Sequence, residues 1–122
     1  MNVQTRAIAV IDDDVRVLES LVNLLASFGY KANAYNSAEQ FLDSGTLPLT
    51  SCIISDVEMR QMSGFSLLEH LKKSQYDVPV IIITGKPSER SEAFYLEHGA
   101  VGFFRKPVDG DVLLDLIDTV CS

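Results

Sequence analysis

The chain has 122 residues, of which 47% are apolar, and carries 17 acidic against 10 basic side chains, a net charge of −7. This length fits one domain, and the apolar content is that of a globular fold. The acidic charge argues against direct binding of nucleic acid or anionic membranes. No apolar run approaches the roughly 20 residues of a membrane span, and no signal-peptide pattern is present, so we expect a cytoplasmic protein with no membrane partner.

Short apolar runs indicate five strands, separated by longer segments. The runs are Ala7–Ile11, Lys31–Tyr35, Cys52–Ser55, Val80–Ile83 and Gly102–Phe104. The first and fourth runs are continuously apolar and rich in Val and Ile. This composition is typical of parallel strands that are covered by helices on both faces.

The intervening segments show helical spacing of apolar residues, with recognisable start and stop signals. Ser37 and Ser88 are candidate N-caps of the second and fourth helices, and Asp14 is a candidate N-cap of the first. Gly29 and Gly99 are candidate helix stops. Five strand–helix repeats predict an α/β fold with a doubly wound, five-stranded parallel sheet.

Polar residues follow four of the five predicted strands. Asp12 and Asp13 follow the first strand, Asp56 the third, Thr84 the fourth and Lys106 the fifth. In doubly wound sheets the carboxyl ends of the strands line one crevice, where ligands bind. We therefore expect these five side chains to converge.

Such a group of side chains suits phosphoryl chemistry. Two carboxylates ~4 Å apart repel by about 4 kcal/mol at an effective dielectric constant of 20, so the acids favour a bound cation such as Mg²⁺. An aspartate beside Mg²⁺ can act as a nucleophile and form an aspartyl phosphate. The hydroxyl of Thr84 and the ammonium of Lys106 suit the oxygens of a phosphoryl group.

The sequence resembles the receiver domain of bacterial two-component response regulators, and most closely the receivers joined to helix-turn-helix transcription factors. The resemblance covers essentially the whole chain, with every motif in order. The matching stretches are residues 9–14 (AVIDDD), 53–59 (IISDVEM), 62–64 (MSG), 81–85 (IIITG) and 99–107 (GAVGFFRKP).

The resemblance implies a flavodoxin-like fold and a single receiver domain over residues 1–122. It implies that Asp56 is the phosphoacceptor. It also implies that Mg²⁺ is held by Asp12, Asp13, Asp56 and the backbone carbonyl of Glu58.

Three further residues receive roles from the resemblance. Lys106 would pair with the phosphoryl oxygens, and the Lys106–Pro107 peptide is expected to be cis. Thr84 and Phe103 would form the switch, with Thr84 moving toward the phosphoryl group and Phe103 turning inward.

The expected function is a phosphorylation-activated signalling switch rather than an enzyme, although the domain assists its own phosphorylation and dephosphorylation. A histidine kinase is the expected phosphodonor, and a second copy of the chain is a candidate partner on phosphorylation. The responding face would be formed by the last two helices and the fifth strand, with candidates Phe94, Tyr95, Val101 and Phe104. DNA binding would require an output domain outside this sequence.

Two alternatives remain at this stage: a phosphatase of the haloacid dehalogenase type, and a docking module that is not phosphorylated. The first is disfavoured because Arg16 stands where Thr or Val is needed and because Asp56 would have no role. The second is disfavoured because every chemical residue is present.

Two other features carry weaker expectations. Glu58 and Lys86 are hypothesised to approach each other across the mouth of the site and to limit access of water to the phosphoryl group. Cys52 and Cys121 lack metal-ligand spacing, and Cys52 is interpreted as a small buried apolar residue.

Overall fold

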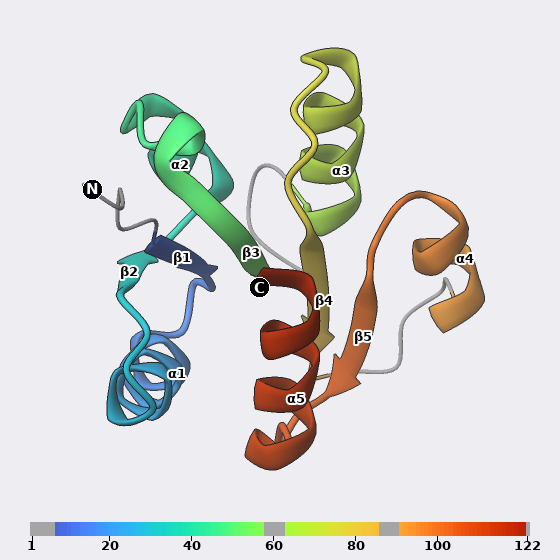
Figure 1. Ribbon diagram of the computed structural model, residues 1–122. Coiled ribbons are helices and arrows are strands. Elements are labelled where there is room, and N and C mark those ends of the chain that lie inside the picture. Colours follow the sequence, from blue (N-terminus) through green and yellow to red (C-terminus); the bar gives the residue numbers. More distant parts are fainter. Residues whose placement is uncertain (1–6, 58–62, 86–90, 122) are drawn as a thin grey trace.

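A five-stranded parallel sheet forms the centre of the molecule. The computed structural model describes residues 7–57, 63–85 and 91–121. The strands are β1 (Ala7–Ile11), β2 (Ala32–Tyr35), β3 (Thr50–Asp56), β4 (Val80–Thr84) and β5 (Gly102–Arg105). Their order is β2-β1-β3-β4-β5, which runs from left to right across Figure 1. All four pairings are parallel, which confirms the doubly wound α/β fold predicted from the sequence.

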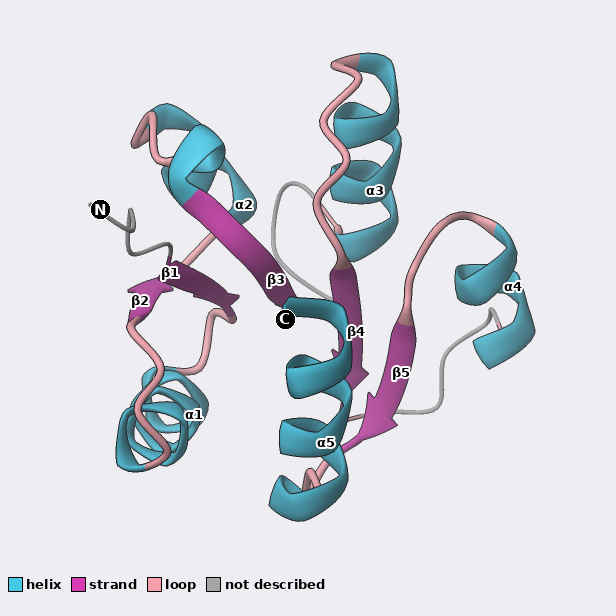
Figure 2. Cartoon of the chain, viewed as in Figure 1, coloured by secondary structure: helices cyan, strands magenta, loops and turns pink. Residues whose placement is uncertain are grey.

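Helices alternate with the strands along the described chain, as Figure 2 shows. They are α1 (Val15–Ser27), α2 (Ala38–Asp43), α3 (Gly64–Lys73), α4 (Glu92–Glu97) and α5 (Gly110–Cys121). A short 3₁₀ helix, η1 (Leu47–Leu49), precedes β3 and was not predicted. Among the residues described, no helix is both long and apolar enough to cross a membrane.

The sheet separates two hydrophobic cores. On one face α1 and α5 pack against alternate residues of the central strands, with Leu21, Leu25 and Ile117 among the buried side chains. On the other face α2, α3 and α4 contribute Phe41, Leu67 and Tyr95 to the second core. Because both faces are covered, β1 and β4 are buried along their whole length.

Most of the predicted helix signals are confirmed. The side chain of Asp14 accepts a hydrogen bond from the backbone of Arg16, and Ser37 caps α2 through Gln40. Gly29 and Gly99 follow α1 and α4 with φ of +88° and +108°, a left-handed conformation that glycine adopts without steric cost.

The predicted cap of α4 is wrong. Its N-cap is Ser91, whose hydroxyl accepts a hydrogen bond from the backbone N–H of Phe94, and the helix begins at Glu92. Ser88 lies outside the described residues. Both serines precede the apolar pattern at a distance compatible with capping, so the sequence alone favoured the wrong one.

Candidate functional site

Strand register places two aspartates side by side at the carboxyl edge of the sheet. Ile11 pairs with Ser55 between β1 and β3, so Asp12 and Asp56 stand next to each other at neighbouring strand ends. Both strands are rich in branched apolar residues that favour this buried, pleated environment. The fold therefore brings the two carboxylates together from positions far apart in the sequence.

Three carboxylates form a compact cluster at this edge. Asp12, Asp13 and Asp56 each offer an oxygen within 4.8 Å of the others. Asp12 is completely buried and Asp56 is 7% exposed, whereas Asp13 faces solvent. Burial weakens solvent screening of the charges, so the cluster is unfavourable without positive charge nearby. Hard carboxylate oxygens with one side open to water are a donor set that fits Mg²⁺.

Lys106 supplies positive charge to this cluster. Its Nζ lies 2.8 Å from Asp12 Oδ2 and 3.7 Å from Asp56 Oδ2. Partial burial acts to lower the pKa of Lys106, but the hydrogen bond to Asp12 and the charges of Asp56, Asp12 and Asp14 outweigh it and leave this pKa raised. Lys106 therefore stays protonated and neutralises part of the acidic charge.

The local backbone orients this lysine. The N–H of Lys106 donates to the carbonyl oxygen of Thr84 at 2.8 Å, and the Lys106–Pro107 peptide is cis, as the resemblance implied. A Cβ placed on Gly85 would stand 3.2 Å from Cδ of Lys106, so the missing side chain leaves room for the lysine stem. The resemblance included Gly85 in a motif, but no pattern in the sequence explains why a glycine stands there.

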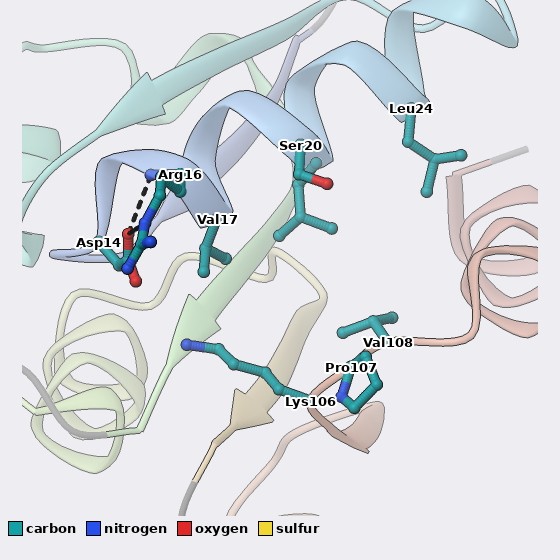
Figure 3. A pocket seen from close by; sticks show the side chains of 9 residues that line it. Asp14, Arg16, Val17, Ser20, Leu24, Lys106, Pro107 and Val108 are labelled. Atoms are coloured by element: carbon teal, nitrogen blue, oxygen red, sulfur yellow. Dashed lines mark hydrogen bonds and ion pairs between the residues drawn. The ribbon is translucent and has the colours of Figure 1, made fainter.

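A groove of about 480 Å³ borders the lysine (Figure 3). Its walls come from α1, including Val17 and Leu24, and from Pro107 and Val108 in the connection between β5 and α5. Figure 3 shows the Lys106 stem beside this groove, with its ammonium extending away from Pro107 and Val108. Apolar contact along the stem with the charge at its tip is typical of a partly buried lysine.

The two expected switch residues lie on neighbouring strands and on the same face of the sheet. Phe103 pairs with Ile82, and Thr84 lies two residues after Ile82 on the same strand. The side chains of Thr84 and Phe103 therefore both project toward the core beneath α4. Thr84 is buried. Phe103 is half-buried, its ring stacks on Tyr95 with centroids 5.7 Å apart, and the Arg105 guanidinium lies 5.8 Å from its centroid.

Not every expectation for the responding face is correct. Tyr95, a candidate surface residue, is only 2% exposed because it points from α4 into the core. Val101 is exposed, whereas Phe94 and Phe104 are half-buried. Glu58 and Lys86 lie outside the described residues, and so does their hypothesised approach.

The fold and the site together are those of a flavodoxin-like domain with an acidic edge and a lysine as counter-charge. Comparison with known proteins assigns the family. Residues 8–118 match the response regulator receiver domain, and the chain belongs to this family. The family is a signalling family rather than a classical enzyme family, which argues against the phosphatase alternative.

Several curated proteins are similar over nearly the whole chain. The response regulator protein TmoT of Ectopseudomonas mendocina is 34% identical over 119 residues, which are 98% of this chain and 54% of TmoT. The transcriptional regulatory protein FixJ of Bradyrhizobium diazoefficiens is 37% identical over 114 residues, which are 92% of this chain and 55% of FixJ. The chain thus spans about half the length of these relatives.

Solved structures show the same fold. The response regulator StyR superposes with a TM-score of 0.88 and 31% identity, over 96% of this chain and 59% of that one. A receiver domain protein from Clostridium thermocellum gives a TM-score of 0.87 and 27% identity, over 95% of this chain and 94% of its own.

Proposed function

We propose that this receiver domain accepts a phosphoryl group on Asp56 from a histidine kinase, with Mg²⁺ bound, and thereby switches a signalling surface. One observation carries the proposal: three carboxylates lie within 4.8 Å of one another, with the Lys106 ammonium against two of them. A cluster of this kind is poorly suited to a structural role, because it concentrates like charge in a partly buried place.

Each residue of the site has a role in the transfer. An oxygen of Asp56 attacks the phosphorus of the donor, the bond from phosphorus to the donor's histidine nitrogen breaks, and the histidine leaves. Lys106 pairs with a phosphoryl oxygen, and the hydroxyl of Thr84 donates a hydrogen bond to another. Both groups stand at strand ends beside Asp56.

The proposed metal ligands are Asp12, Asp13, Asp56 and the backbone carbonyl of Glu58. Bound Mg²⁺ would offset the charge that builds up on the phosphoryl oxygens. The chain's own contribution is orientation: Asp12 is held by the backbone N–H of Asp14 at 2.9 Å and by Lys106. These contacts fix a carboxylate at the buried end of the cluster.

Phosphorylation would change the surface through Thr84 and Phe103. The phosphoryl group adds charge and acceptor oxygens in place of a carboxylate, which favours a shift of the Thr84 hydroxyl toward it. Phe103 lies on the same face of the sheet and would follow into the vacated space. The response would reach α4, β5 and α5, where the half-buried Phe104 and the exposed Val101 are candidates for contact with a second copy of the chain.

The wider context is proposed on the same basis. We take residues 1–122 as a single receiver domain of a cytoplasmic response regulator without a membrane partner. The relatives named as regulatory proteins are about twice as long as this chain. Any contact with DNA would then belong to an output part outside this sequence, because the net charge of −7 disfavours binding of DNA by this domain.

Acetyl phosphate tests the proposal directly. Incubation of the chain with Mg²⁺ and acetyl phosphate should add one phosphoryl group, and peptide mass analysis should place it on Asp56. Asp56→Asn should remove the adduct because an amide is not a competent nucleophile. Asp115→Asn, a substitution at an exposed aspartate of α5, should leave phosphorylation unchanged.

Failure would be clear in either of two ways. Wild-type protein that remains unmodified under donor excess would support the non-phosphorylated docking module. An adduct that persists in Asp56→Asn would show that another residue is the acceptor.

A further inference from the structure

Two cysteines from distant parts of the sequence meet in the core beneath α1 and α5. Cys52 lies in β3 and is fully buried in this core. Cys121 is the last residue of α5, packs against the same core, and is only partly buried. Its Sγ stands 3.9 Å from the carbonyl oxygen of Ser51, the residue before Cys52. Figure 1 likewise marks the C-terminal end beside β3.

The two thiols lie close together in this core. The structure has both cysteines free, and each thiol donates a hydrogen bond to a backbone carbonyl of β3, Cys52 to Ile53 and Cys121 to Ser51, both at 3.9 Å. Each thiol also shifts the pKa of the other. Neither residue has a role in the acidic site.

We propose that Cys52 and Cys121 form a reversible intramolecular disulfide when a peroxide oxidises the domain. The bond would tie the end of α5 to β3. It is a modification site separate from phosphorylation, because Cys52 lies toward the amino end of β3 whereas Asp56 is its last residue.

The environments of the two sulfurs assign their roles. The neighbouring Cys52 thiol and the contact with Ser51 lower the pKa of the Cys121 thiol to about 7, although burial and the nearby Asp118 carboxylate oppose this effect. The pKa of Cys52 is raised, by its interaction with Cys121 and by burial. Cys121 is therefore the accessible thiolate that reacts first, and Cys52 is the protected thiol that completes the bond.

The chemistry balances with hydrogen peroxide as the oxidant. The Cys121 thiolate attacks one peroxide oxygen, the O–O bond breaks, and the departing hydroxide takes up a proton, which leaves Cys121 as a sulfenic acid. The Cys52 sulfur then attacks the sulfenic sulfur. The S–S bond forms, the S–O bond breaks, and the hydroxide leaves with the Cys52 proton as water. Two thiols and one peroxide thus give one disulfide and two waters.

The test is peroxide treatment of the reduced chain at neutral pH. Samples are quenched with a thiol-alkylating reagent in denaturant, digested without reductant and mapped by mass spectrometry. We expect a linked peptide pair that contains Cys52 and Cys121 and has lost two hydrogens. Treatment with dithiothreitol should restore two alkylatable thiols.

Matched variants separate the two roles. Cys52→Ala should accumulate a Cys121 sulfenic acid that dimedone traps, whereas Cys121→Ser should leave Cys52 reduced at the same peroxide dose. If Cys52→Ala fails to fold, the rate at which Cys121 of the wild-type chain reacts with peroxide is the deciding measurement. Cys121 should react about tenfold faster in the folded chain than in urea-unfolded chain, because only the fold lowers its pKa.

Four results would overturn the proposal. These are equal rates in folded and unfolded protein, conversion of Cys121 to sulfinic acid without a cross-link, cross-links only between chains, and the absence of reaction. None of these readouts depends on Asp56 or on phosphorylation, so the outcome is independent of the proposed function.

Discussion

The ammonium of Lys106 lies between Asp12 and Asp56, and its removal would leave the buried acids without this counter-charge. Lys106→Met should therefore destabilise the fold in the absence of divalent cations. We expect a loss of about 1–3 kcal/mol, below the range for fully buried pairs because the lysine keeps some contact with water. Urea unfolding in the presence of a chelator measures the loss, with Lys72→Met on the surface of α3 as the control. Equal losses of stability in Lys106→Met and Lys72→Met would contradict the role of Lys106 as counter-charge to the buried acids.

The same pair gives an expected alkaline pH dependence. The pKa of Lys106 in the fold is raised above the ordinary 10.5, because the hydrogen bond to Asp12 and the acidic charges outweigh burial. A raised folded pKa means that the stabilisation is complete below 10.5 and is lost as pH rises through the folded value. The stability gap between wild type and Lys106→Met should thus be constant from neutral pH to about pH 10 and narrow only as pH rises above 10.5. If the stability difference between wild type and Lys106→Met already decreased near neutral pH, the charge of Lys106 would not be its cause.

At the scale of single residues, the sequence identified the acidic cluster and its lysine but not their surroundings. Asp12, Asp56 and Lys106 were predictable because strand ends in a parallel sheet share one edge. Tyr95 was misplaced because an aromatic residue on a short helix gives no periodicity from which its direction can be read. The proximity of Cys121 to Cys52 was not predictable, since it depends on how α5 docks across the sheet.

At the scale of elements, α3 offers a local test of stability. Its N-cap is Ser63, whose hydroxyl oxygen accepts a hydrogen bond from the backbone N–H of Ser66 at 3.1 Å. Ser63→Ala should destabilise the domain by about 1 kcal/mol, because it leaves this N–H without its capping acceptor. Chemical denaturation measures the effect. Ser20→Ala, at an exposed position within α1, should cost nothing and so serves as the control. Equal losses of stability in Ser63→Ala and Ser20→Ala would show that the capping hydrogen bond of Ser63 is not the source of the effect.

Element boundaries show where a pattern stops being informative. The strand Ala7–Ile11 was predicted to the residue, because its apolar run ends at three charged residues. β3 begins earlier than predicted, at Thr50, because Thr50 pairs with Ala7 of β1. Thr50 and Ser51 are polar, so the apolar pattern used to predict a buried strand did not include them. Tertiary pairing, rather than local preference, sets that boundary.

At the scale of the whole molecule, Mg²⁺ should stabilise the folded state if the acidic cluster holds it. A ligand that binds only the folded state adds about 1.4 kcal/mol at tenfold excess over its dissociation constant. The melting temperature should rise with Mg²⁺ concentration, and Asp13→Asn should weaken the effect by removing the exposed ligand. Asp43→Asn at the end of α2 is the matched control. A melting temperature that does not respond to Mg²⁺ would contradict the proposed metal site.

The proposed disulfide also has a global effect. It would close a loop of roughly 70 residues, which in the chain-entropy model stabilises the fold by about 4 kcal/mol. The peroxide-treated chain should melt at a higher temperature than the reduced chain, and dithiothreitol should reverse the difference. Calorimetry of both forms measures this change. A lower melting temperature after oxidation would show that the bond strains the packing of α5.

The register between β4 and β5 places a glycine where a helix comes close to the sheet. β4 is apolar toward both cores, so its hydrophobic pattern would tolerate a slip by one residue. Gly102 pairs with Ile81, and a Cβ there would run into Leu116 of α5. A slipped β5 would bring Val101 or Phe103 to this spot, and the end of the Leu116 side chain would have to move to make room. A single hydrogen atom in place of a side chain therefore lets the end of Leu116 pack directly against β5, a fit that a shifted alignment of the strands would disturb.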